Sequence, residues 1–284
     1  MTVESLAGPE APFTLVGKTA IVTGGGRGIG RAIVQLLASA GAHVLAADLD
    51  EEALTETRSL VRQPNLVASI HGNLTDPAFP QRIVNAALES FHSIDILVNC
   101  AGFTWDSVIQ KTSDEQFLAM LDIHVVAPFR LLRAASDYLR ETAKRDIAAG
   151  QRVMRKVVNI TSISGTDGNA GQAGYGAGKA GVIGLTKTLA KEWGRYNINV
   201  NAVGFGLIQT RMTQPLKPEG KINIGGKDIP VGVPPAMLES IAAACPLGRI
   251  GTAEEAAGAV LFFCSPLSDY VTGEVLICSG GFHF

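Results

Sequence analysis

The chain has 284 residues, of which 46% are hydrophobic and 18% are charged, and its formal net charge is −2. This length can bury a sizeable core in one large domain, and the near balance of charge argues against nucleic acid as a partner. No apolar run approaches the roughly 18–20 residues that cross a bilayer, so we expect a cytoplasmic protein without a membrane partner.

The first 14 residues contain Glu4, Glu10 and two prolines but no basic start. We therefore expect a loose N-terminal arm over residues 1–14 rather than a secretory signal, with one domain over residues 15–284. The four cysteines lack C-x-x-C spacing and the five histidines lack the spacing of metal ligands. We expect small buried thiols and no metal site.

A glycine-rich turn follows the first apolar run, residues 18–22, and precedes a helical pattern. Its spacing is Gly24-xxx-Gly28-x-Gly30, which is neither G-x-G-x-x-G nor a Walker loop. Strand, glycine turn and helix together predict a nucleotide-phosphate site, because free backbone N–H groups and the positive helix end point at the pyrophosphate.

Asp48 closes the second expected strand, residues 43–47, some twenty residues after the turn. An acid there accepts hydrogen bonds from the adenosine ribose and repels a 2′-phosphate. Alternatively these acids cap the helix expected over residues 51–61, and Asp50 could cap while Asp48 binds. A base inside such a turn is found in some NADP-preferring proteins, so Arg27 favours the alternative cofactor, NADP. We favour NAD, because the acid occupies the place where the phosphate would have to lie.

Strand-like and helix-like runs alternate along the rest of the chain. The pattern predicts an α/β fold: a single-domain, doubly wound Rossmann fold with a parallel sheet of about seven strands and helices on both faces. Further strands are expected at residues 66–70, 94–99, 157–160, 198–203 and 274–278, and helices at 80–91, 113–140 and 253–264. Ser113 and Gln116 resemble a capping box.

Two segments stand out from this alternation. Residues 140–156 carry six bases against two acids, which usually marks a solvated face but could also receive an acidic carrier protein. Residues 211–245 are rich in proline and glycine, and we expect an extended lid without regular structure that decides the substrate.

Tyr175 and Lys179 stand four residues apart on one expected helix, so their side chains share a face. A nearby ammonium favours the phenolate and should lower the pKa of the tyrosine. The pair is a candidate general acid/base, although such a pair alone usually marks only an amphipathic face.

Together these motifs resemble the short-chain dehydrogenase/reductase family. The glycine turn from Thr23 to Gly30, the turn from Asn99 to Gly102, Ser162, and Tyr175 with Lys179 match the family pattern in order, from about residue 16 to residue 282. The sequences of residues 198–203 and 246–251 most resemble the 3-oxoacyl-[acyl-carrier-protein] reductase branch of the family. The turn after the sixth strand has Phe205-Gly206 where the family has Pro-Gly, which puts its fine geometry in doubt.

The resemblance implies catalytic roles for four residues. Ser162 would bind the substrate oxygen, Tyr175 would pass the proton, and Lys179 would hold the nicotinamide ribose. Relatives have Asn where His124 stands, and that Asn holds a water chain leading to the lysine. The alternative for His124 is a packed core residue. As a relay, an imidazole that titrates near pH 6.5 would impose an acid limb on the rate.

The resemblance also implies which residues line the cofactor. Asn73 would meet the adenine amino group, and Ile208 and Thr210 would hold the nicotinamide carboxamide. The expected cofactor-binding positions are Gly24, Arg27, Gly28, Ile29, Gly30, Asp48, Leu49, Asn73, Leu74, Asn99, Ala101, Gly102, Tyr175, Lys179, Gly206, Ile208 and Thr210.

The expected function is therefore an NAD(P)-dependent oxidoreductase that interconverts a carbonyl and a secondary alcohol. The expected substrate is a 3-oxoacyl group linked to a carrier protein or to CoA, and the expected assembly is a homodimer or homotetramer. One alternative is a dehydrogenase of a sugar, polyol or steroid alcohol. Another is a non-catalytic cofactor sensor or scaffold, which would have no need for Ser162, Tyr175 and Lys179 together.

Overall fold

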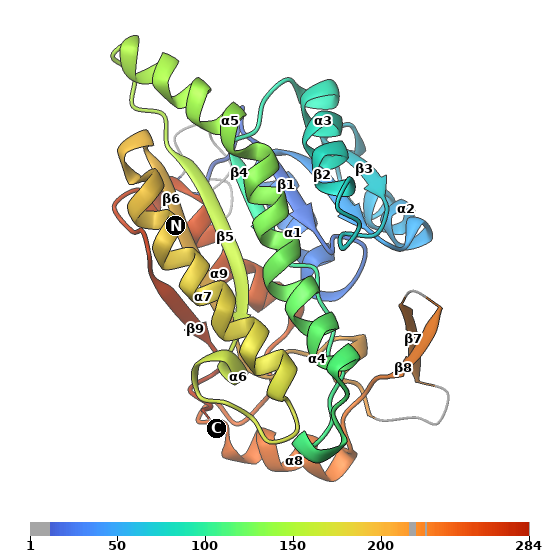
Figure 1. Cartoon of the computed structure of the whole chain (residues 1–284). Helices are drawn as coiled ribbons and strands as arrows, with labels where there is room; N and C mark the ends of the chain where they lie inside the picture. The colour runs from blue at the N-terminus through green and yellow to red at the C-terminus, as the bar shows by residue number, and fades with distance from the viewer. Residues whose placement is uncertain (1–11, 216–219, 225, 284) are drawn as a thin grey trace.

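A parallel sheet of seven strands forms the centre of the computed structural model, which describes residues 12–215, 220–224 and 226–283 (Figure 1). The strand order β3-β2-β1-β4-β5-β6-β9 reverses between β1 and β4, which confirms the doubly wound α/β prediction. The strands are β1 (Thr19–Thr23), β2 (His43–Asp48), β3 (Val67–His71), β4 (Ile96–Asn99), β5 (Arg155–Ser162), β6 (Ile198–Phe205) and β9 (Val275–Cys278).

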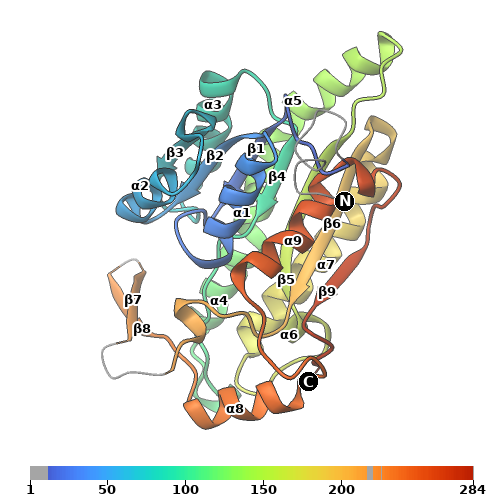
Figure 2. The ribbon, with the colours of Figure 1, turned by 180° about the vertical axis from the view of Figure 1, so that it is seen from behind.

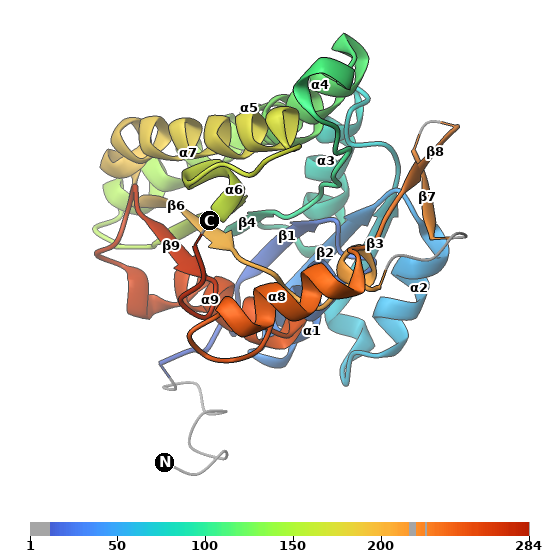
Figure 3. The ribbon, with the colours of Figure 1, turned by 90° about the horizontal axis from the view of Figure 1, so that it is seen from below.

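Helices cover both faces of this sheet, which explains why its central strands are apolar throughout rather than alternating. In β1, Ala20 and Val22 face one core cluster and Ile21 faces the other. The first face packs against α1 (Gly28–Ser39), α2 (Glu51–Ser59) and α9 (Ala253–Cys264), and Figure 2 shows α1 and α9 across it. The second packs against α3 (Phe79–Phe91), α5 (Ala127–Ala148) and α7 (Ala173–Trp193), so the sheet lies between two helical layers (Figure 3).

The region expected as one helix over residues 113–140 is divided. Helix α4 (Asp114–Leu121) begins at Ser113, whose side chain forms the predicted capping box with Gln116. A single π-helical segment, Asp122–Val126, then leads into α5, which continues to Ala148. π-helical turns widen the helix locally and are frequent at functional sites. This one carries His124 toward α7.

The prediction that residues 211–245 lack regular structure is wrong. They contain a hairpin of β7 (Lys221–Ile224) and β8 (Lys227–Pro230), followed by α8 (Pro235–Ala244). Ile222 and Ile229 are paired across the hairpin and both are buried. Pro234 and Pro235, read as loop signals, instead begin α8, since proline is favoured at the first helical position.

The basic run over residues 140–156 is only partly a solvated face. Arg155 and Lys156 are each 4% exposed in β5, where Arg155 pairs with Asp146 and Lys156 with Asp269. Both lie at the amino end of β5, opposite Ser162 at its carboxyl end. The run therefore does not form one continuous surface for an acidic carrier protein beside the site.

The remaining element boundaries agree with prediction to within one or two residues. Short helical turns occupy the connections, namely α6 (Ile163–Thr166) and 3₁₀ turns at Pro64–Leu66, Ile109–Lys111, Gly194–Tyr196, Arg211–Thr213 and Pro266–Ser268. Residues 1–11 of the expected arm lie outside the described residues. Within the described ranges, no helix is long and apolar enough to cross a membrane.

Candidate active site

One cavity of about 1190 Å³ runs across the carboxyl ends of β1, β2, β4, β5 and β6. Its lining includes the glycine turn at one end and Ser162, Tyr175 and Lys179 at the other. Every residue expected at the site lines it except Asn99. The Asn99 amide instead donates to Asn159 Oδ1 over 2.8 Å, so this side chain braces β4 against β5.

The glycine turn fits a dinucleotide phosphate. Gly24 has φ +70°, and a Cβ there would come within 2.7 Å of Ala101 Cα. A Cβ on Gly30 would lie 1.9 Å from the Gly24 carbonyl oxygen, so only glycine lets the turn close against α1. No side chain caps the first turn of α1. Its free N–H groups and the positive helix end therefore remain open to an anion.

A second contact ties this turn to the one after β4. Thr23 Oγ1 accepts hydrogen bonds from the backbone N–H groups of Cys100 and Ala101, at 3.1 and 3.2 Å. The sequence reading assigned no role to this hydroxyl. It links the glycine turn to the turn after β4, and both turns line the cavity.

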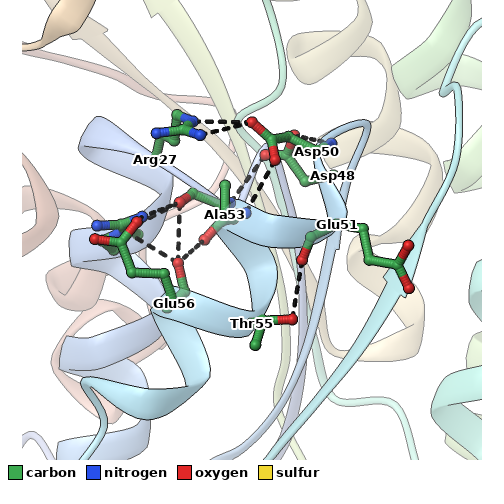
Figure 4. Close-up of polar contacts among 11 residues, drawn as sticks. Arg27, Asp48, Asp50, Glu51, Ala53, Thr55 and Glu56 are labelled. Atoms are coloured by element: carbon green, nitrogen blue, oxygen red, sulfur yellow. Dashed lines mark hydrogen bonds and ion pairs between the residues drawn. The ribbon is translucent and has the colours of Figure 1, made fainter.

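Asp48 and Asp50, at the end of β2, have different hydrogen-bond partners (Figure 4). Asp50 accepts from Ala53 N and caps α2, confirming the expected cap. Asp48 accepts from Gly26 N with Oδ2, at 2.9 Å, and from Asp50 N with Oδ1, at 3.1 Å. Its carboxylate is thereby fixed at the cavity edge, where further lone pairs remain for ribose hydroxyls.

Asn73 lines the cavity, and its side chain already accepts hydrogen bonds within the protein. Its Oδ1 accepts from Thr75 N at 3.0 Å and from the Thr75 hydroxyl at 2.8 Å. Such a local turn holds the amide in place. The predicted contact with an adenine amino group would have to share this oxygen.

Ser162, Tyr175 and Lys179 meet where β5 faces α7. Ser162 is the last residue of β5 and Thr161, beside it, donates to the Lys179 carbonyl at 2.7 Å. A Cβ on Gly165 would lie 2.7 Å from the Lys179 backbone, so α7 approaches closely only because that residue is glycine. The Lys179 ammonium donates to Ile160 O at 2.9 Å and lies 5.7 Å from the centre of the Tyr175 ring.

The protonation of this pair differs from the sequence prediction. Burial raises the pKa of the Tyr175 phenol to about 12, opposed by a hydrogen bond from Ser162, and burial lowers the pKa of Lys179 to about 8. The prediction that Lys179 lowers the pKa of Tyr175 is therefore wrong. The ammonium donates to Ile160 O, and burial destabilises its charged form.

His124 is 2% exposed and packs edge-on against Tyr175, with ring centres 5.1 Å apart. Its Nε2 lies 2.9 Å from the Phe103 carbonyl oxygen and must donate there, which leaves Nδ1 as an acceptor. Burial, with the nearby Lys179 charge, holds the pKa of His124 well below 6.5. The expectation of a titrating His124 near neutral pH is therefore wrong. Nδ1 is buried without a hydrogen-bond partner among the described residues.

One group of polar residues in the cavity lining was not predicted from the sequence. Gln172 donates to Asp106 Oδ2 at 2.8 Å and accepts from the Ser164 hydroxyl at 2.8 Å. Ser164 lies in α6 and Gln172 immediately precedes α7, whereas Asp106 follows β4, so the contact between these two segments has no signal in the sequence. The cavity is also lined by the buried Ile222 and Ile229 of the hairpin and by the buried Val231, which follows it.

The chain is similar to known proteins over nearly its whole length. A family model described as enoyl-(acyl carrier protein) reductase matches residues 24–283. The 3-oxoacyl-[acyl-carrier-protein] reductase of Thermotoga maritima is 35% identical over 271 residues, covering 94% of this chain and 98% of that protein.

Other relatives carry different names at similar identity. The 2-dehydro-3-deoxy-D-gluconate 5-dehydrogenase of Bacillus subtilis is 33% identical over 271 residues, covering 95% of this chain and 96% of its own. The 3alpha-hydroxysteroid dehydrogenase of Mediterraneibacter gnavus is 34% identical over 269 residues, covering 94% and 97%.

The fold is also shared with a solved structure. The crystal structure of a short-chain dehydrogenase/reductase from Brucella melitensis, titled glucose/ribitol dehydrogenase, superposes with a TM-score of 0.77 at 26% identity. The match covers 95% of this chain and 98% of that one. With its glycine turn and its serine, tyrosine and lysine along one cavity, the chain belongs to the short-chain dehydrogenase/reductase family and is an NAD(P)-dependent oxidoreductase.

Proposed function

We propose that the chain interconverts a carbonyl and a secondary alcohol with Ser162, Tyr175 and Lys179 as its catalytic residues. One observation carries this proposal: the three side chains line the cavity that the glycine turn also lines. A bound nicotinamide nucleotide supplies a hydride in reduction and accepts one in oxidation. The remaining steps belong to the protein's own residues.

We assign the proton to Tyr175. Since burial raises the pKa of its phenol to about 12, the group stays protonated at neutral pH and suits donation to a carbonyl oxygen as that oxygen gains charge. Ser162 would donate a second hydrogen bond to the same oxygen. Lys179 would hold ribose hydroxyls, and the buried Nδ1 of neutral His124 would accept from a proton-carrying water.

We infer that the cofactor is NAD(H). Asp48, fixed by Gly26 N and Asp50 N, lies at the end of β2 on the cavity edge. Its carboxylate would accept from ribose hydroxyls and repel a 2′-phosphate. Asp48 and Asp50 place two carboxylates beside Arg27 at this end of the cavity, which Arg211 also lines.

For the substrate we propose a 3-oxoacyl thioester. The name of the Thermotoga maritima relative supports this class, and the apolar cavity lining contributed by Ile222, Ile229 and Val231 suits an acyl chain better than a sugar. A steroid alcohol is the second candidate, since the same apolar lining suits it and one relative is named for it. The three intact catalytic residues argue against a non-catalytic scaffold.

A screen of purified protein tests the proposal. Acetoacetyl-CoA, a 3-hydroxysteroid and a polyol are each offered with NAD(H) and with NADP(H), while the absorbance of the reduced cofactor is followed. We expect turnover of the thioester with NADH. Turnover of only the polyol would contradict the proposed substrate. Turnover of none of the three compounds with either cofactor would contradict the proposed reaction.

A further inference from the structure

The guanidinium of Arg27 already forms an ion pair with a carboxylate of the protein. Arg27 stands at the N-cap of α1, on the cavity edge beside Asp48. Its Nε and Nη2 both donate to Asp50 Oδ2, at 3.1 and 2.8 Å (Figure 4). The cation that would otherwise favour a 2′-phosphate therefore has a carboxylate partner within the protein.

Asp50 is held in this position independently of Arg27. Its second oxygen, Oδ1, accepts from Ala53 N at 2.9 Å and caps α2. That backbone bond and the Arg27 guanidinium hold the pKa of Asp50 below its usual range, so it stays ionised. One carboxylate thus serves two helices, with one oxygen on each.

Arg31, a neighbouring cation, is also bound by groups of the protein. Arg31 donates to the Gly26 carbonyl oxygen, with Nη2 at 2.8 Å, and to Thr57 Oγ1 at 3.1 Å. Its Nη2 also pairs with Glu56. Arg31 therefore holds the glycine turn against α2, and its guanidinium is already bound by protein groups rather than open to a phosphate.

We propose that Asp50 is a specificity-determining residue that excludes NADP(H) by withholding Arg27 from the 2′-phosphate. The inference rests on the proposed nucleotide site and adds to it a second acid, distinct from Asp48. A phosphate must displace Asp50 from the guanidinium and approach the carboxylates of Asp48 and Asp50, near which Arg211 is a further cation. Discrimination requires only that this partly exposed pair, together with repulsion from the two carboxylates, favours the ligand without the 2′-phosphate.

The variant Asp50→Asn tests this, because an asparagine oxygen still caps α2 but no longer neutralises Arg27. Binding of 2′,5′-ADP and of 5′-AMP is measured by calorimetry at low and at raised ionic strength. We expect Asp50→Asn to bind 2′,5′-ADP about 10-fold more tightly than the unmodified protein, with 5′-AMP changed less than about 2-fold. The gain should shrink as salt is raised.

Two controls separate release of Arg27 from loss of any negative charge. Glu51→Gln removes an exposed acid from the same turn that does not contact Arg27, and should change 2′,5′-ADP binding less than about 2-fold. Arg27→Ala combined with Asp50→Asn should abolish the gain. An equal gain in Glu51→Gln, or a gain that persists without Arg27, overturns the inference.

The outcomes also distinguish this inference from the proposed function. If the unmodified protein binds neither 5′-AMP nor NADH, the proposed nucleotide site is wrong. If it binds both, and Asp50→Asn gains nothing toward 2′,5′-ADP, the site stands and only the role of Asp50 is wrong. Tight binding of 2′,5′-ADP by the unmodified protein would directly contradict the proposal that Asp50 keeps Arg27 from binding a 2′-phosphate.

Discussion

The imidazole of His124 fills the space that a side chain on Gly102 would need. A Cβ on Gly102 would come within 2.4 Å of His124 Cε1, and one on Gly178 would come within 3.0 Å of His124 Cβ. The ring is thus clamped between the turn after β4 and the catalytic helix α7. Its Nε2 bond to Phe103 and its edge contact with Tyr175 complete the clamp.

This relationship predicts a coupled pair of substitutions. Gly102→Ala should cost about 1–3 kcal/mol of unfolding free energy, because the added methyl overlaps the imidazole. In the His124→Asn background, whose side chain is shorter, the same change should cost less than half as much. Denaturant unfolding of the two single variants and the double variant gives the coupling. Strictly additive costs would contradict the clamp.

A second prediction concerns the pH dependence of His124. Because burial keeps the imidazole neutral, His124→Asn should change kcat/KM by the same factor from about pH 6 to about pH 9, while the melting temperature falls. Profiles of kcat/KM against pH for both proteins check this. An acid limb present in the unmodified protein and absent from the variant would show that the histidine does titrate.

The position of His124 within a family motif could be read from the sequence, but its protonation depends on burial and on Lys179 from another helix. The same holds for Tyr175, whose pKa is set by burial more than by the lysine four residues away. Shared position on a helix face does not say where an ammonium points.

The sheet, by contrast, was predictable almost throughout. Buried parallel strands are continuous apolar runs, and the helix from Ala253 to Cys264 has the bounds that its periodicity predicts. Hydrogen bonds between segments far apart in the chain, such as Gln172 with Asp106 and Thr23 with Ala101, leave no signal in the local sequence. The hairpin β7-β8 was missed because each strand is only four residues long.

A third prediction follows from Lys179, whose pKa burial lowers from 10.5 to about 8. Between these values the unfolded chain binds the proton more tightly than the folded protein, so unfolding free energy rises with pH. Relative to Lys179→Met, the unmodified protein should gain about 2 kcal/mol between about pH 7 and about pH 9.5. Denaturant titrations of both proteins measure this. A difference that is constant or falls with pH is inconsistent with a buried ammonium.

A fourth prediction concerns Asp48. The variant Asp48→Asn keeps one oxygen for Gly26 N but loses the charge beside the ribose. We expect NADH to bind about 10-fold more weakly and discrimination against NADPH to relax. Fluorescence titration of both reduced cofactors gives the two dissociation constants. Unmodified protein that already prefers NADPH would give Arg27 the larger role.

The central claim is that the Tyr175 hydroxyl carries the proton, and the variant Tyr175→Phe tests it most directly. The ring still packs against His124, so folding and NADH binding should remain close to those of the unmodified protein. The value of kcat for reduction of a 3-oxoacyl thioester should fall by roughly 10²–10⁴-fold, as expected when general acid catalysis is lost. Retention of more than about half the activity, with NADH binding unchanged, would contradict the assignment of Tyr175.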